Sequence, residues 1–133
     1  MATIRDHAWL NGSAASVWQL VGDPLAIQEW APSILSSSMQ GSTRTLVLKR
    51  GGCVVEEIIT LDPALRRIQY GVREGLPVTS HLGTVDVIET GEKSCLIIYS
   101  TDVTPDSIAE AIRSALRASL KVLTERFGAT ALR

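Results

Sequence analysis

Apolar and polar residues alternate with a period of two over much of this chain, which is the pattern of half-buried β-strands. The alternation is clearest in the TRTLVLK run of residues 43–49. Runs of this kind recur along the chain, separated by residues that favour turns. They predict strands over Thr3–Leu10, Ile34–Met39, Thr43–Lys49, Cys53–Leu61, Arg67–Glu74, Val78–Glu89 and Ser94–Asp102.

Short turns join most of these strands. Gly51 and Gly52 predict a tight hairpin, because glycine readily adopts the positive φ angles that such turns require. Asp62-Pro63 and Gly75-Leu76-Pro77 break the chain before the next strands. Strands that follow one another through hairpins are antiparallel, and a sheet built from them curls.

Two short helical segments interrupt the strand pattern after the first strand. The first follows Asn11 and Ser13, either of which could cap it, and it ends at Gly22-Asp23-Pro24. The second covers Leu25–Trp30 and stops at Ala31-Pro32. Each is shorter than the ~12 residues that favour an independent helix. We therefore expect them to brace a larger element.

A long amphipathic helix is predicted from Pro105 to Phe127, with Gly128 as its C-terminal stop. Small residues on its apolar stripe, facing a curved sheet, would leave an open cavity, although alanine could also serve helix propensity and close packing. The stripe is Ile108, Ala111, Ile112, Ala115, Leu116, Ser119, Leu120, Leu123 and Phe127.

Composition narrows the classes of protein that fit. A chain of 133 residues with 45% hydrophobic residues is expected to be one domain with a real core. Its net charge of −1 argues against nucleic acid or an anionic membrane as partner. No apolar run reaches the ~18 residues of a membrane span, and the N-terminus lacks the layout of a signal peptide. Cys53 and Cys95 have neither metal nor disulfide spacing, so we expect apolar fillers in a reduced, cytoplasmic protein.

The element order and several short motifs resemble the START-like, Bet v 1-type helix-grip superfamily. Within it, the chain is similar to polyketide cyclase/dehydrase and lipid-transport proteins of the SRPBCC kind. The residues that carry the resemblance are Val17-Trp18, Gly22-Asp23, Trp30, Pro32, Arg44-Thr45-Leu46, Gly51-Gly52, Glu56, Leu61-Asp62, Arg67, Tyr70 and Pro77-Val78.

The resemblance covers residues 1–133 as one START-like ligand-cavity domain. It implies an α+β helix-grip fold, in which a seven-stranded curved antiparallel sheet wraps around the long C-terminal helix. Two short helices would lie between strands 1 and 2, and a deep apolar pocket between sheet and helix. Aromatase/cyclases, lipid carriers, hormone receptors and chaperone activators share this fold, so the fold does not settle the chemistry.

His81 is the first candidate for proton transfer. Period two places it on the face of Gly83, Val85 and Val87, which is expected to be the core face, so the imidazole should point into the cavity. Proteins that the chain resembles often carry an aromatic residue at this position, so a histidine here departs from the pattern of the family. The alternative is a core histidine bonded to a backbone carbonyl.

Glu56 and Glu57 are neighbours in a strand, so one faces inward and the other outward. The resemblance favours Glu56, with Arg44 on the adjacent strand as its partner. A carboxylate in an apolar cavity must be paired, protonated or in contact with substrate. A structural pair without chemistry is the alternative.

Tyr70 could offer a hydroxyl to a substrate carbonyl or simply find a structural hydrogen-bond partner. Tyr99 is expected to face outward, and Asp102 to face inward, where it could orient His81 or cap a turn. Trp18 is expected in the core. Residues expected to bind substrate are Trp30, Ile58, Val72, Ile98, Ser100, Asp102, Ile112, Ala115 and Ser119.

These features predict a cofactor-independent enzyme, without a metal site, that folds a hydrophobic, polyketide-like molecule and moves protons. Cyclisation, dehydration or isomerisation would suit His81 as acid or base, Arg44 and Tyr70 as groups that polarise a carbonyl, and Glu56 as base or as the partner that orients Arg44. The alternatives are a non-catalytic carrier of a lipid or similar ligand, and a chaperone-associated interaction domain with a filled core. Monomer and homodimer both remain open.

Overall fold

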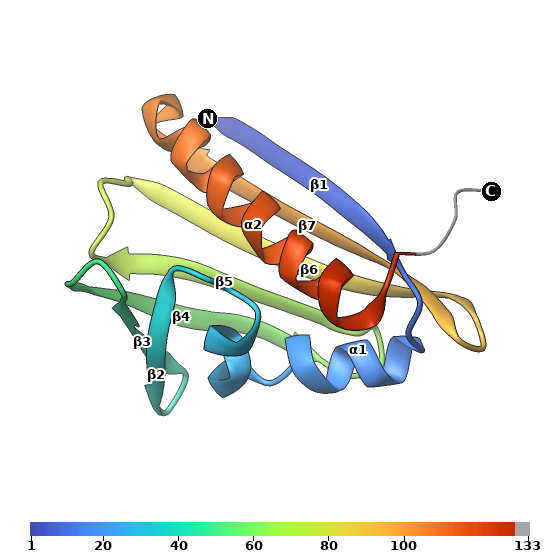
Figure 1. The fold of residues 1–133 in the computed structure, drawn as a ribbon. Coiled ribbons are helices and arrows are strands. Elements are labelled where there is room, and N and C mark those ends of the chain that lie inside the picture. Colours follow the sequence, from blue (N-terminus) through green and yellow to red (C-terminus); the bar gives the residue numbers. More distant parts are fainter. Residues whose placement is uncertain (130–133) are drawn as a thin grey trace.

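A computed structural model describes residues 1–129 of the chain (Figure 1). All of the predicted elements are present. Their bounds are β1 (Ala2–Leu10), α1 (Ala14–Val21), the 3-10 helix η1 (Pro24–Glu29), β2 (Ile34–Gln40), β3 (Thr43–Leu48), β4 (Cys53–Asp62), β5 (Arg67–Glu74), β6 (Ser80–Gly91), β7 (Ser94–Thr104), the 3-10 turn η2 (Asp106–Ile108) and α2 (Ala109–Phe127).

The strands form one seven-stranded antiparallel sheet in the order β1-β7-β6-β5-β4-β3-β2. Consecutive strands from β2 to β7 are neighbours, because short turns join them. The segment that contains α1 and η1 crosses from β1 at one edge to β2 at the other. The sheet curls around α2, as Figure 1 shows. The predicted helix-grip fold is thus confirmed.

Local sequence explains where the two short helices begin and end. The Ser13 hydroxyl accepts a hydrogen bond from the Ser16 backbone N–H (3.1 Å) and so caps α1. Asp23 caps η1 in the same way through the N–H of Leu25 (3.0 Å). A Cβ atom at Gly22 would lie 2.5 Å from the Trp18 ring, so a glycine is needed there. The sequence predicts Trp18 in the core, but the residue is only partly buried and packs against the core.

The position of α2 leaves part of the sheet's concave side uncovered. Leu116, Leu120 and Leu123 of α2 are buried, and the helix packs mainly against β1 with fewer contacts to β7. Both strands lie at one side of the sheet. The concave surface of β3, β4 and β5 therefore faces space that α2 does not fill.

Two expectations need correction. Cys95 is buried as an apolar filler, but Cys53 is exposed because it lies at the start of β4, on the face opposite buried Val54. The C-terminal helix also does not begin at Pro105: a 3-10 turn comes first, and α2 starts at Ala109. Within residues 1–129, no helix is long and apolar enough to cross a membrane.

Candidate functional site

The space between α2 and the concave face of the sheet is a cavity of about 440 Å³. This volume lies within the ~300–1,000 Å³ of ordinary small-molecule sites. Most of the lining is apolar. Its polar residues lie on strands β3 to β7, in the β3–β4 turn, on α2 and just before β2. The lining residues are Ile27, Ala31, Ser33, Ile34, Arg44, Leu46, Leu48, Lys49, Arg50, Val54, Glu56, Tyr70, Val72, Leu76, His81, Tyr99, Thr101, Ile108, Ala111, Ile112, Ala115, Leu116 and Ser119.

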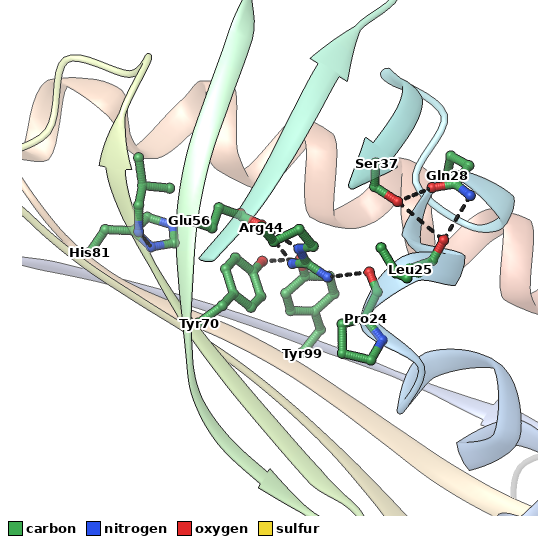
Figure 2. A network of polar contacts seen from close by, with 10 residues as sticks. Pro24, Leu25, Gln28, Ser37, Arg44, Glu56, Tyr70, His81 and Tyr99 are labelled. Carbon is green, nitrogen blue, oxygen red and sulfur yellow. Dashed lines mark hydrogen bonds and ion pairs between the residues drawn. The ribbon is translucent and has the colours of Figure 1, made fainter. Parts of the chain in front are cut away.

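Arg44 and Glu56 form a buried ion pair in the cavity wall. The two residues are directly opposite each other in the register of β3 and β4, which brings their side chains together. Nε and Nη2 of Arg44 donate to Oε1 of Glu56 at 2.8 Å and 2.6 Å. Nη1 donates to the carbonyl oxygen of Pro24 at 2.9 Å, so Arg44 also ties η1 to the sheet (Figure 2).

Glu56, not Glu57, is the carboxylate that faces the cavity. Both hydrogen bonds from Arg44 end on its Oε1 atom, and Oε2 accepts none from the residues the structure describes. Burial raises the pKa of Glu56, and the charge of Arg44 offsets part of that shift. The result is a carboxylate with one oxygen held and the other available to a bound molecule.

Two tyrosines flank this pair. The hydroxyls of Tyr70 and Tyr99 are hydrogen-bonded to each other, and the guanidinium carbon of Arg44 lies 5.4 Å from the centre of the Tyr70 ring. Burial raises the pKa of Tyr99 to about 12 and that of Tyr70 well above its usual value. Both hydroxyls therefore stay protonated near neutral pH, and one of them can donate beyond the pair.

His81 lies beside the same cluster. Its ring centre is 5.6 Å from that of Tyr70, and its Nδ1 accepts a hydrogen bond from the backbone N–H of Val72 at 3.3 Å. Burial lowers the pKa of His81, which keeps the imidazole neutral. A neutral ring whose Nδ1 is an acceptor carries its proton on Nε2. His81 can therefore donate a hydrogen bond through Nε2–H, whereas its basic nitrogen, Nδ1, is already occupied by the Val72 N–H.

The structure brings all four predicted catalytic residues to one wall. Figure 2 shows Arg44, Glu56 and Tyr70 close together, with His81 to one side of them; the four residues come from four adjacent strands. Of the predicted substrate-binding residues, Val72, Ile112, Ala115 and Ser119 line the cavity.

The predicted face of β7 was wrong. Tyr99 and Thr101 point into the cavity, whereas Ile98, Ser100 and Asp102 lie on the outer face of the sheet. Asp102 cannot orient His81, because it accepts a hydrogen bond from the Thr3 hydroxyl (2.5 Å) on the other side. Apolar residues occupy both faces of β7, so the alternation alone could not identify the inner one.

Two further predicted contacts do not reach the cavity. Trp30 is 2% exposed and packs against Tyr99, with ring centres 5.8 Å apart, so it supports the wall from behind. Ile58 follows Glu56 on the inner face of β4, but it packs against the core without lining the cavity. The bulge between Ile58 and Thr60 shows how irregular β4 is at this point.

Sequence reasoning missed Tyr99, Thr101 and two basic residues at the edge of the cavity, Lys49 and Arg50. The last two belong to the β3–β4 turn, and only the fold shows that this turn borders the cavity. Among residues 1–129, no cluster of three or more His, Cys, Asp or Glu side chains could hold a metal ion.

The sequence matches the family described as polyketide cyclase/dehydrase and lipid transport over residues 1–131. No curated protein sequence matches the chain. Among known structures, the protein XoxI from Bacillus cereus is 27% identical, with a TM-score of 0.90 and 96% of each chain covered. A protein from Thermobifida fusca is also 27% identical, with a TM-score of 0.83 over 96% of this chain and 94% of that one.

Two more distant structures share the fold. The di-domain ARO/CYC BexL from the BE-7585A biosynthetic pathway is 16% identical, with a TM-score of 0.82 over 94% of this chain and 46% of that one. Norcoclaurine synthase from Thalictrum flavum is 21% identical, with a TM-score of 0.73 over 94% of this chain and 85% of that one.

Proposed function

The chain belongs to the polyketide cyclase/dehydrase and lipid transport family, and we propose that it is a cofactor-independent enzyme acting on a hydrophobic, polyketide-like ketone in its cavity. The reaction would begin with removal of a proton from the carbon next to the carbonyl. The enolate formed in this way can then lead to cyclisation, dehydration or isomerisation.

The observation that carries the proposal is the pairing of an available carboxylate oxygen with hydrogen-bond donors on one apolar wall. Oε2 of Glu56 would accept the proton from carbon. The Nε2–H of His81 and a hydroxyl of the Tyr70–Tyr99 pair would donate to the carbonyl oxygen as negative charge develops on it. Arg44 would hold Glu56 in place, and its positive charge would keep a fraction of the Glu56 carboxyl groups ionised despite burial.

The remaining lining would position the substrate. Apolar residues of α2, of η1 and of strands β2 to β5 form the apolar walls, which can hold a flexible chain near its reactive geometry. Such positioning can supply up to ~7–11 kcal/mol of barrier lowering. The structures of BexL and norcoclaurine synthase support the proposal only through the shared fold.

A carrier without turnover is the second candidate. The observation in its favour is that Arg44 is fully engaged by Glu56 and Pro24, so that the cluster could be purely structural. Its polar groups would then only anchor an oxygen of a bound lipid or similar ligand. The membership of the family supports binding of a hydrophobic small molecule in either case.

Hydrogen–deuterium exchange at the α carbons of 2-decanone separates the two candidates. The ketone is incubated with the protein in D2O near neutral pH, and its mass is followed over time. We expect wild-type protein to accelerate the exchange and Glu56→Gln to lower that acceleration by about a hundredfold or more, which is typical for the loss of a general base. His81→Phe should also lower it, without removing a charge.

Binding of 2-decanone is measured in parallel, and circular dichroism checks that each variant is folded. Ala115→Trp, at the edge of the cavity, should remove both binding and exchange, whereas Ser114→Trp on the exposed side of α2 should change neither. Binding without any exchange above the buffer rate would reject the enzymatic proposal in favour of the carrier.

A further inference from the structure

The charges that line the cavity do not balance. Its charged residues are Arg44, Lys49, Arg50 and Glu56, since the His81 ring is neutral, and Glu56 is already paired with Arg44. Neither Lys49 nor Arg50 forms an ion pair with any residue between 1 and 129. Two positive charges therefore remain without a partner.

These two residues lie where the cavity meets solvent. Both are exposed, yet both line the cavity, so they form part of its rim. Leu76, in the β5–β6 connection, and Ile108, just before α2, line the same cavity. Figure 1 shows the β3–β4 turn, the β5–β6 turn and the start of α2 at one end of the molecule.

The acidic residues of η2 and of the first turn of α2 do not neutralise this rim. Asp106 pairs with the N-terminal amino group of Met1 at 3.2 Å, and Glu110 pairs with Arg113 at 3.2 Å. Glu56 is the only acidic side chain among the described residues that line the cavity. The charged side chains that line the rim are thus both positive, and the walls between them and the Glu56 cluster are mostly apolar.

We propose that the natural ligand is an anionic amphiphile, with a carboxylate or phosphate monoester between Lys49 and Arg50 and its apolar body in the cavity. This inference rests on the proposed function and adds an orientation to it: the charged end lies at the rim, and the ketone faces Glu56 and His81. Ion pairs at a solvent-exposed rim are individually weak, so they would determine which ligand binds and in which direction, and would add little to the affinity.

The experiment uses N-phenyl-1-naphthylamine as a fluorescent probe of the cavity. Dodecanoate, dodecyl phosphate and dodecan-1-ol are compared as competitors at low ionic strength. We expect at least one of the two anions to displace the probe at a concentration roughly three- to tenfold lower than the alcohol. The anion with the larger preference identifies the headgroup.

The preference should disappear in Lys49→Gln/Arg50→Gln, while displacement by dodecan-1-ol stays unchanged. Lys93→Gln/Lys121→Gln is the matched control, because it removes the same charge from exposed positions that do not line the cavity. The control should keep the preference, and added salt should weaken it in wild-type protein.

Two results would overturn the inference alone: equal displacement by anions and alcohol, or a preference that survives in Lys49→Gln/Arg50→Gln. Probe binding that persists unchanged in Ala115→Trp would have a wider meaning. It would show that the cavity is not the binding site, and it would overturn the proposed function together with the inference.

Discussion

At the scale of single residues, Arg44 and Glu56 determine the electrostatics of the cavity wall. They are 2% and 4% exposed, respectively. Removing two such charges from water is costly, and their mutual attraction offsets that cost only while both are present. The pair therefore adds little net stability, but the protein depends on both members, because loss of either one leaves an unpaired buried charge.

Arg44→Met should lower the free energy of unfolding by about 3–5 kcal/mol, since it leaves the Glu56 carboxylate without a partner. Arg44→Met/Glu56→Leu should recover most of that loss, because it removes both charges. Urea denaturation measures both effects. A double variant as unstable as the single one would show that packing, not the unpaired charge, causes the loss.

His81 makes stability depend on pH in a predictable direction. Its pKa in the folded protein lies below the ordinary value of 6.5, because burial disfavours the charged ring. The unfolded chain therefore binds a proton more readily as the pH falls through 6.5. The contribution of the neutral His81 ring to the free energy of unfolding is therefore complete above pH 6.5, and it is lost as the pH falls toward the lowered pKa of the folded protein.

We expect the free energy of unfolding to fall between pH ~7.5 and ~5.5 by less than about 1.4 kcal/mol per pH unit on account of His81. The raised pKa of Glu56 acts in the opposite direction, so His81→Gln is needed to isolate the effect. That variant should lose this part of the pH response. His7→Gln, on the exposed side of β1, should retain it.

At the scale of elements, β5 and β6 position the tyrosine pair through a close contact. Tyr70 and Gly83 are directly opposite each other in the register. A Cβ atom at position 83 would lie 2.5 Å from Cζ and 2.8 Å from the hydroxyl oxygen of Tyr70. Because Gly83 has no side chain, the Tyr70 ring can occupy the space beside it while its hydroxyl reaches that of Tyr99.

Gly83→Ala should therefore displace Tyr70, lower the free energy of unfolding by about 1–3 kcal/mol and reduce α-proton exchange. Gly91→Ala is the matched control in the same strand, because its added methyl group would meet mainly the flexible Ser94 side chain. Stability is followed by urea denaturation and exchange by the 2-decanone assay. Unchanged exchange in a folded Gly83→Ala variant would argue against a role for the Tyr70 hydroxyl.

At the scale of the whole molecule, the cavity exists because α2 packs off-centre. The helix lies mainly over β1, whereas the polar cluster lies on β3 to β7, across the concave face. A third candidate function, an interaction domain with a filled core, would not leave this space. A ligand that fills it binds only the folded state and should stabilise the protein by mass action.

N-phenyl-1-naphthylamine at about a hundred times its dissociation constant should raise the free energy of unfolding by about 2.7 kcal/mol. The same concentration should have little effect on Ala115→Trp and its full effect on Ser114→Trp. Urea titrations with and without the probe provide the measurement. An equal rise in Ala115→Trp would place the binding outside the cavity.

The sequence by itself determined the order of elements, the end of the long helix at Gly128 and the antiparallel hairpins, because propensity, turn chemistry and period-two alternation act locally. It also indicated cavity-facing positions for Tyr70 and His81, since each of their strands has one apolar face. The choice of Glu56 over Glu57 came from the family resemblance, and its pairing with Arg44 depends on the register of β3 and β4. Only the tertiary structure decided the inner face of β7, because Leu96 and Ile98 are as apolar as Cys95 and Ile97. The tertiary structure also decided that Lys49 and Arg50 border the cavity, since their turn meets the cavity only in the folded chain. It likewise decided that His81 offers a donor, since the backbone N–H of Val72 on the neighbouring strand occupies its Nδ1.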